Sequence, residues 1–416
     1  MIKLEGGGRF TAAAVSQGLL SGGSLAVTIV LTRMLGLEGF GVVALVLLGA
    51  GFAAGLVQAL AVQPFLSLGP RATRPGRAAA LVLIAAGISV SAGLVAAVVT
   101  PQLVGVSPFC AFFAVLARAA APAFRALAFG RGRLLGALVV DASGGFGALA
   151  AVWIIASFTG WTIEAALCGL TVGGLVGALV TARGTELAPG RRRLTASLAR
   201  SWRDGRWLAL TQGFSWLGTG RVHIAAAGLL GPAAVGALRA AQALIGALGV
   251  ALQALELYLP HGARIARRRG EIGTWTVRWS LWSSGAMLVM SSALWAFGVP
   301  LARLLAASEK DAQLTLDALV VLALLPAIGA ITGVVSVALR AVGATRTIAA
   351  CYTVTALLSA AIAGPLVSNF GLFGAASGLV LGQLFYAALL CASSRSSLGP
   401  STVQKLVCVT TGHMGA

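Results

Sequence analysis

Three arginine residues lie inside apolar segments long enough to cross a membrane: Arg118, Arg221 and Arg239. A guanidinium stays protonated when it leaves water, and a charge at the centre of a bilayer costs about 2.5–3.5 kcal/mol on insertion scales. Each group must therefore face a water-filled cavity, a carboxylate or an anionic ligand. Because acids within these segments are few, the three arginines together favour an anion-binding site. A structural ion pair or a snorkelling contact would still explain any one of them.

Asp141, in the fifth apolar segment, is the candidate acid inside the membrane. Two functional roles fit it: partner of one of the three arginines, or carrier of a coupling proton, because buried carboxylates with shifted proton affinity cluster at functional sites. A purely structural ion pair explains the residue equally well. The sequence leaves these interpretations open.

The remaining reactive residue types form no catalytic constellation. His223, His261 and His413 have no carboxylate or cysteine at a spacing typical of a metal site or a catalytic triad, and the five cysteines are dispersed. His223 is two residues from Arg221, so the two side chains point to different faces of a helix, and we interpret this histidine as structural. We therefore expect a membrane transporter rather than an enzyme, with neither a metal nor a cofactor.

Composition predicts the elements that hold these residues. Of the 416 residues, 58% are hydrophobic and 10% are charged, whereas soluble domains carry about 25% charged residues. Apolar windows of about 20 residues, enough to cross about 30 Å of hydrocarbon, recur along nearly the whole chain. We predict an all-α polytopic membrane protein with about twelve transmembrane helices. The predicted spans are 11–32, 40–68, 78–100, 107–129, 134–157, 161–182, 207–229, 233–258, 279–302, 314–339, 347–367 and 371–393.

The basic residues, which give the chain a net charge of +19, favour one side of this arrangement. Most of the 30 Lys and Arg residues fall in the two termini and the even-numbered connections, whereas the opposite side holds Arg33, Arg303 and Lys310. Cytoplasmic loops retain positive charge, so the pattern predicts a bacterial inner-membrane protein with cytoplasmic N and C termini. The basic loops would lie against anionic membrane lipids, and we expect no nucleic-acid partner.

Short motifs repeat between the two halves of the chain. Leu35-Gly36-x4-Gly41 recurs as Leu230-Gly231-x4-Gly236 at an offset of 195 residues, and Arg125-Ala126-x4-Arg131 recurs as Arg340-Ala341-x4-Arg346. Helices six spans apart cross the bilayer in the same direction, so the repeat is parallel, with its axis along the membrane normal. We predict two six-helix bundles around a central cavity. The expected boundaries are 1–185 for the N-terminal bundle, 186–206 for a basic cytoplasmic linker, 207–393 for the C-terminal bundle and 394–416 for a cytoplasmic tail.

Residues 31–41 resemble a known family signature. Their sequence, LTRMLGLEGFG, is similar to the opening of polysaccharide and oligosaccharidyl-lipid flippases, which belong to the multidrug/oligosaccharidyl-lipid/polysaccharide (MOP) exporter superfamily. Further matches lie at 124–133 and at 229–260. The second includes Arg239-Ala240-Ala241-Gln242 and ends at Leu259-Pro260. With its twelve predicted spans and two halves, the chain resembles this family over most of its length.

The resemblance implies export of an undecaprenyl-diphosphate-linked sugar repeat unit, with polysaccharide polymerase machinery as a further partner. Arg239, Arg118 and Arg221 would then bind the polyprenyl-diphosphate-linked glycan. Arg239 falls on the cavity arginine of the similar lipid II flippases, but the acid that precedes it there is Leu238 here. The first span reads Ser21-Gly22-Gly23-Ser24 and lacks their arginine–aspartate pair, which argues against a lipid II role.

Two other functions are compatible with the sequence. The first is a drug or small-metabolite antiporter of the same superfamily, although an antiporter of cationic drugs would need acids rather than arginines in its cavity. The second is a non-transporting membrane scaffold, which requires that the buried arginines be paired and that no continuous cavity exist.

Overall fold

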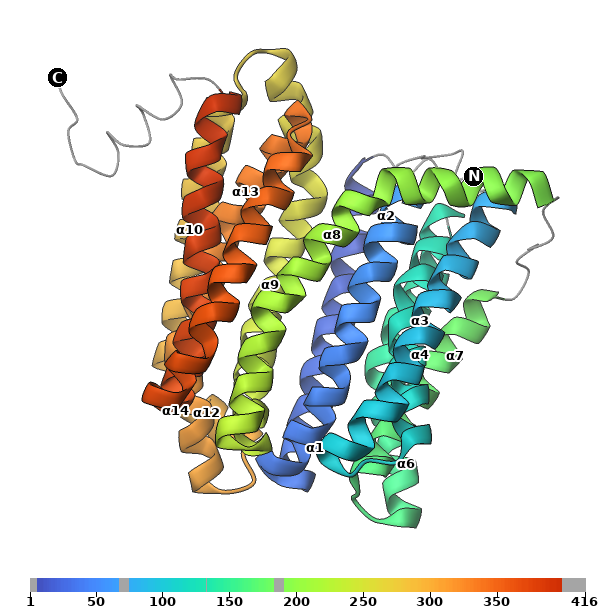
Figure 1. Ribbon diagram of the computed structural model, residues 1–416, viewed down its shortest axis with the longest axis vertical. Helices are drawn as coiled ribbons and strands as arrows, with labels where there is room; N and C mark the ends of the chain where they lie inside the picture. Colours follow the sequence, from blue (N-terminus) through green and yellow to red (C-terminus); the bar gives the residue numbers. More distant parts are fainter. Residues whose placement is uncertain (1–5, 67–74, 132, 183–190, 399–416) are drawn as a thin grey trace.

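The computed structural model of the protein describes residues 6–66, 75–131, 133–182 and 191–398 (Figure 1). Every element of secondary structure in this part of the chain is helical, which confirms the predicted all-α fold. The α-helices are α1 Gly6–Val57, α2 Gln63–Leu66, α3 Pro75–Val104, α4 Pro108–Gly130, α5 Leu134–Ala142, α6 Ala148–Thr159, α7 Ile163–Ala182, α8 Arg191–Leu230, α9 Pro232–Arg268, α10 Ile272–Ala296, α11 Gly298–Leu305, α12 Glu309–Leu322, α13 Leu325–Val342 and α14 Thr345–Leu398. Two π-helical turns, η1 Gln58–Val62 and η3 Ser143–Gly147, interrupt the helical stretches.

Length and composition suit these helices to a bilayer. Among the described residues, seven helical stretches are long and apolar enough to cross a membrane, or eight when the bent pair α10 and α11 counts as one span. Two of the longest, α1 and α14, each consist of two helices that meet at a non-helical glycine, Gly36 and Gly371 respectively. The chain is therefore a multi-pass membrane protein.

The helices form two bundles that lie side by side (Figure 1). Helices α1 to α7, blue to green in the figure, make the N-terminal bundle, and α9 to α14, yellow to red, make most of the C-terminal bundle. Helix α1 packs extensively on α9, while α8 packs on α14 and also contacts α1 and α3. We name the upper end of the molecule in Figure 1, where α8 begins, the Arg191 end, and the lower end, where α1 turns, the Gly36 end.

The turns at the Gly36 end repeat the same backbone conformation in both halves. Gly36 has φ 68° and ψ 175°, and Gly231, between α8 and α9, has φ 89° and ψ 171°. A side chain strains the backbone at such positive φ values, whereas glycine adopts them readily. The Leu-Gly motif that recurs in the sequence therefore marks equivalent turns, and the predicted repeat is confirmed at this point.

The second glycine of each motif brings the two bundles together. A Cβ added at Gly41 would overlap the carbonyl group of Pro232, and one added at Gly236 would overlap that of Leu37. Positions 37 and 232 are equivalent in the repeat, as are positions 41 and 236. The contact is thus reciprocal, as an approximate two-fold axis between the bundles requires.

Two expected spans contain a break between helices. The span predicted at 314–339 lies within one apolar stretch, Glu309–Val342, in which α12 ends at Leu322 and α13 begins at Leu325. Pro326 lies in the first turn of α13, where its missing N–H needs no partner. Pro326 therefore begins a helix and does not kink one. The span predicted at 279–302 is broken at Phe297, where α10 and α11 meet at 68°.

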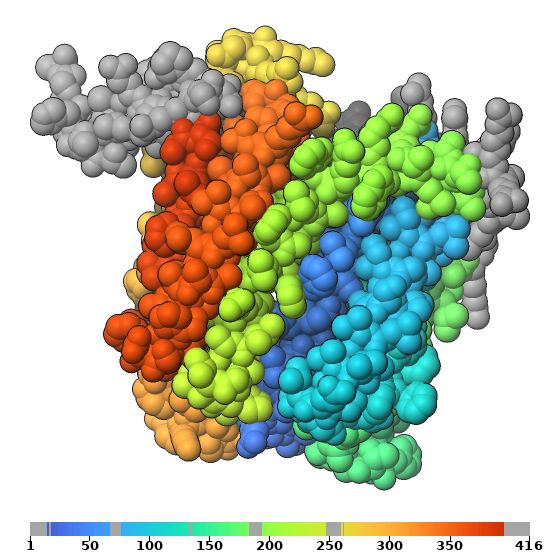
Figure 2. Space-filling view, viewed as in Figure 1, coloured from blue at the N-terminus to red at the C-terminus, as the bar shows by residue number. Residues whose placement is uncertain are grey.

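The stretch 186–206, expected as a linker, is helical from Arg191 onward and continues into the rest of α8. The first part of α8 lies across the Arg191 end of the N-terminal bundle, and the helix then descends along the C-terminal bundle (Figures 1 and 2). Gly205 faces the N-terminal bundle, where an added Cβ would lie 2.7 Å from the carbonyl oxygen of Ala59. The exposed residues on this part of α8 include Arg200, Trp202, Arg203, Arg206 and Trp207.

Candidate functional site

Arg118 is held near the middle of α4 by a carbonyl group from the next span. Its Nη1 atom donates a hydrogen bond of 3.0 Å to the carbonyl oxygen of Gly144, in the π-helical turn η3. The neighbouring Gly145 packs against Gly23 of α1, where an added Cβ would lie 2.6 Å from the Gly145 Cα atom. Protein surrounds the Arg118 side chain closely, yet the residue keeps part of its accessible surface. The guanidinium is thus fixed in place within the N-terminal bundle.

Asp141 pairs with an arginine that the sequence did not single out. Its Oδ2 atom lies 3.2 Å from Nε of Arg125, one of the basic residues near the end of α4, and the Asp141 side chain is only 3% exposed. Arg125 also lies over the ring of Phe129, at 5.7 Å. The expectation that Asp141 would balance Arg118, Arg221 or Arg239 is therefore corrected, because α4 presents Arg125, two turns from Arg118, to this carboxylate.

Arg239 takes part in a polar cluster between α9 and α8. It lies one helical turn beyond the contact residue Gly236, and its Nη1 atom donates a 3.3 Å hydrogen bond to Oε1 of Gln242. His223 of α8, which is 2% exposed, lies close enough for both residues to act on it electrostatically. The cluster is closely surrounded by protein, although Arg239 keeps some accessible surface.

His223 is the member of this cluster that sequence reasoning missed. Its Nδ1 atom lies 2.9 Å from the carbonyl oxygen of Thr219. A carbonyl oxygen can only accept a hydrogen bond, so Nδ1 carries a proton, and in the neutral ring Nε2 is left as an acceptor. Nε2 is buried without a well-formed hydrogen bond. No signal along the sequence indicated this position, because the contact joins two helices.

Arg221 does not join the cluster. Its side chain is exposed on α8, whereas His223, two residues further, is buried. The expected separation of these two side chains onto different faces of one helix is confirmed.

The cations at Arg118 and Arg239 have no carboxylate partner in the described part of the chain. The ion pairs seen there, which include Arg125–Asp141, Arg203–Asp204 and Arg303–Glu309, involve other arginines. Two guanidinium groups, one in each bundle, therefore lie deep in the protein with only neutral oxygen acceptors. Within the same residues, no group of three His, Cys, Asp or Glu side chains is arranged to hold a metal ion.

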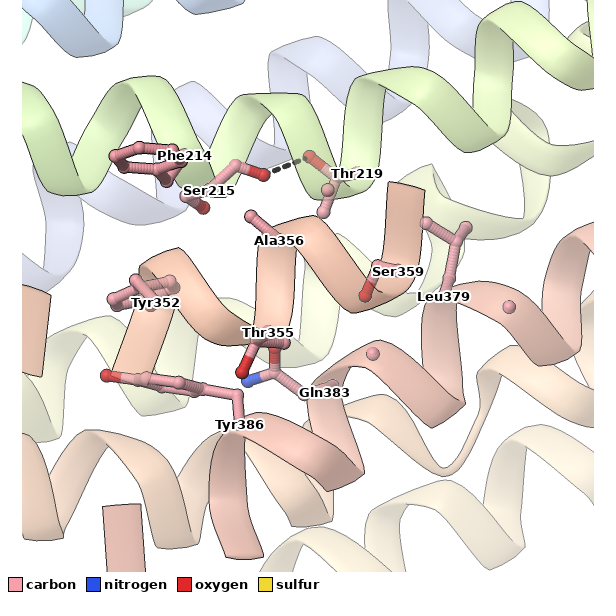
Figure 3. Close-up of a pocket in the computed structure, with 13 residues that line it drawn as sticks. Phe214, Ser215, Thr219, Tyr352, Thr355, Ala356, Ser359, Leu379, Gln383 and Tyr386 are labelled. Atoms are coloured by element: carbon pink, nitrogen blue, oxygen red, sulfur yellow. Dashed lines mark hydrogen bonds between the residues drawn. The ribbon is translucent and has the colours of Figure 1, made fainter. Parts of the chain in front are cut away.

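The C-terminal bundle also contains a small pocket of mixed polar and apolar lining between α8 and α14 (Figure 3). Its volume is about 40 Å³, enough for a few water molecules. Tyr352 and Tyr386 stack at one side with ring centroids 3.9 Å apart, and the buried hydroxyl of Thr355 has no hydrogen-bond partner. All of the residues that line it are uncharged, and they include Ser215, Thr219, Ser359 and Gln383. A pocket of this size and polarity does not fit a sugar diphosphate.

No protein-family model matches this sequence. No curated protein matches it either. Several solved structures do share its fold. A lipid II flippase, MurJ, in an inward closed conformation, matches with a TM-score of 0.68 and 12% sequence identity, over 98% of this chain and 93% of that chain.

Two further structures match with similar scores. An inward-facing multidrug resistance transporter of the MATE family, in the MOP superfamily, gives a TM-score of 0.66 at 15% identity, over 95% of this chain and 96% of that one. A MOP superfamily transporter from Pyrococcus furiosus, described as having a binding pocket of reverse polarity, gives 0.62 at 15% identity, over 94% and 95% of the two chains. At these identities the likeness shows the fold, which is that of MOP superfamily transporters.

Proposed function

We propose that this chain is a flippase that moves an undecaprenyl-diphosphate-linked oligosaccharide repeat unit across the bacterial inner membrane for surface polysaccharide synthesis. In this proposal the Arg191 end and both termini face the cytoplasm. The observation that carries it is the pair of guanidinium groups, Arg118 and Arg239, that lie deep in the two bundles without a carboxylate partner in the described residues. A buried guanidinium without a carboxylate partner requires an anionic ligand or a water-filled cavity.

A diphosphate headgroup meets that requirement. Arginine binds phosphate oxygens through charge-assisted, bidentate hydrogen bonds, which are about twice as strong as neutral ones. Arg118 would present such bonds from the N-terminal bundle and Arg239 from the C-terminal bundle, with Arg221 in a lesser role because its side chain is exposed. The glycan would cross between the bundles while the polyprenyl tail stays in lipid, and the bundles would rock to expose the site to each side in turn.

The fold supports a substrate of this kind. One solved neighbour that spans nearly the whole chain is a lipid II flippase. The residues at which this sequence departs from that family, Leu238 and the interior of the first span, favour a different lipid-linked glycan over lipid II.

A drug or small-metabolite antiporter is the second candidate, because other neighbours of the same fold are multidrug transporters. A cationic drug needs a free carboxylate in the cavity. The carboxylate inside the N-terminal bundle, that of Asp141, is instead paired with Arg125. This pairing makes the anion exporter the better fit.

The test is export of surface polysaccharide in cells that lack the gene. The wild-type gene should restore export, Arg239→Ala should restore little, and Arg239→Lys should restore an intermediate amount because it keeps the charge but not the bidentate geometry. Arg303→Ala serves as the matched control, since Arg303 is exposed and pairs with Glu309. Full export with Arg239→Ala, or altered drug resistance with normal polysaccharide in the deleted strain, would count against the flippase.

A further inference from the structure

The repeat allows the polar cluster to be compared with its equivalent in the other bundle. His223 corresponds to Thr28, and Thr219 corresponds to Ser24, by the same offset of 195 residues that relates the Leu-Gly turns. The hydroxyl of Thr28 donates to the carbonyl oxygen of Ser24 at 2.9 Å, and Nδ1 of His223 makes the same bond to Thr219 at 2.9 Å. The local geometry is thus the same in both bundles, and an imidazole replaces a hydroxyl in one of them.

The residues around these positions are also more polar in the C-terminal bundle than in the N-terminal bundle. Arg239 corresponds to Ala44, which is 2% exposed, and Gln242 corresponds to Leu47. The N-terminal bundle therefore has Ala44, Leu47 and Thr28, none of them ionisable in water, where the C-terminal bundle has Arg239, Gln242 and His223. The packing of the fold does not require a histidine here, since the other half achieves the same packing without one.

Nε2 of His223 is buried and makes no well-formed hydrogen bond. Arg239 is the charged residue of the described chain that acts on this ring, and Gln242 is its polar neighbour on α9. A guanidinium that acts on an imidazole opposes a second positive charge on the ring. An anion bound to Arg239 would remove this opposition, because it cancels the arginine charge and offers an acceptor to Nε2.

We propose that His223 is the proton-accepting residue of the anion site, so that a phosphate oxyanion binds at Arg239 together with one proton. On binding, a proton from water forms an N–H bond at Nε2, the ring becomes an imidazolium, and Nε2 donates to a phosphate oxygen. On release, the same N–H bond breaks and the proton returns to water. This inference rests on the proposed function only for the identity of the ligand, since a lipid-linked diphosphate, a free diphosphate and an anionic phospholipid headgroup share this chemistry.

The experiment measures proton uptake on binding. The full-length protein, in nanodiscs of phosphatidylcholine, which has no net charge, is titrated with farnesyl diphosphate. The heat of binding is compared between buffers of different ionisation enthalpy, at a pH well above the second phosphate ionisation at about pH 6. Proton uptake then belongs to the protein and not to the probe. The affinity should fall with rising pH, by at most about tenfold per pH unit for a single linked proton.

Three variants sharpen the measurement. His223→Gln should still bind the probe, more weakly, but take up no proton and lose the pH dependence. Arg239→Lys should keep the proton uptake at lower affinity, which provides a second test if His223→Gln fails to fold. Thr28→Val, at the equivalent position of the N-terminal bundle, should change neither quantity.

The outcomes separate the two proposals. Proton uptake by His223→Gln equal to that of the wild type, or firm wild-type binding with no uptake, would overturn the role of His223 and leave the flippase in place. A second outcome is that farnesyl diphosphate does not bind, while inorganic diphosphate or phosphatidylglycerol nanodiscs cause proton uptake. That outcome would support the role of His223 and count against the lipid-linked substrate. Failure to bind any of the three probes would overturn both.

Discussion

The two bundles share a backbone framework but fill equivalent positions with different chemistry. Gly23 packs on Gly145 in the N-terminal bundle, and its equivalent Gly218 packs on Ala356 in the C-terminal bundle, where an added Cβ would lie 3.4 Å from the Ala356 Cα atom. Asp141 lies four residues before Gly145, and Tyr352 lies four residues before Ala356. Asp141 makes a buried ion pair, whereas Tyr352 stacks on another tyrosine.

This comparison shows where the repeat has been kept and where it has diverged. Positions at which backbones touch, such as Gly41 and Gly236, carry the same residue in both halves because a side chain has no room there. Positions whose side chains point into a bundle differ in charge between the two halves, because packing limits the volume of a side chain more strongly than its chemical type. The positions that differ between the bundles, rather than those they share, are therefore the ones to test for a role in transport.

The largest expected effect comes from breaking the ion pair of the N-terminal bundle. Asp141→Ala leaves the Arg125 guanidinium, which is 26% exposed, without its carboxylate, and breaking a buried pair costs about 3–5 kcal/mol. We expect the lower end of that range and a clear fall in the melting temperature of the purified protein. The double variant Asp141→Ala/Arg125→Met should regain most of the loss. Equal stability of Asp141→Ala and the wild type would show that the pair is not structural.

Removing the central cation of the same bundle should affect transport more than stability. Arg118→Ala loses a charge-assisted contact worth about 1.5–3 kcal/mol, which corresponds to a transport rate about 10- to 100-fold lower. Flipping of a fluorescent diphosphate lipid in proteoliposomes measures the rate, and a melting curve of the same preparation is the control. If Arg118→Ala transports normally while Arg239→Ala does not, the anion is bound by the C-terminal bundle alone.

The reciprocal glycine contact predicts matched losses in the two bundles. Gly41→Ala and Gly236→Ala each drive a methyl group into a carbonyl of the other bundle, and overpacking of this kind costs about 1–3 kcal/mol. The two variants should lower thermal stability by similar amounts. Gly49→Ala is the control, since nothing lies within 4 Å of a Cβ added there. A loss confined to one of the two variants would contradict the approximate two-fold relation.

The smallest expected effect lies in the small pocket of the C-terminal bundle. The hydroxyl of Tyr386 lies 3.2 Å from that of Ser336, and Tyr386→Phe removes this hydrogen bond while the aromatic stack remains. A bond between two neutral groups contributes about 0.5–1.5 kcal/mol, so the melting temperature should fall slightly and transport should be unchanged. A large loss of transport would place the pocket in the transport path.

Hydrophobicity and spacing in the sequence were sufficient to predict the all-α membrane fold and the repeat, because apolar length and glycine turns are local properties. They were also sufficient to place Arg118 inside a helix that can cross a membrane, and Arg239 inside a long helix, α9. The ion pair that the sequence left open for Asp141 is observed, but its partner, Arg125, was not among the three candidates. The choice of partner depends on how α4 is rotated against α5, and Arg125 and Arg118 lie only two turns apart. His223 was interpreted as structural for a similar reason: its approach to Arg239 joins two helices whose packing no short sequence pattern encodes.

The continuity of α8 has a mechanical consequence. With 40 residues at about 1.5 Å each, the helix measures about 60 Å, roughly twice the hydrocarbon thickness of a bilayer. It cannot stand upright within the membrane, and its first part rests on one bundle while the rest runs along the other. If one bundle tilts against the other, either the bend in α8 must change or its first part must lift from its support, so we expect α8 to limit how far the two halves can swing.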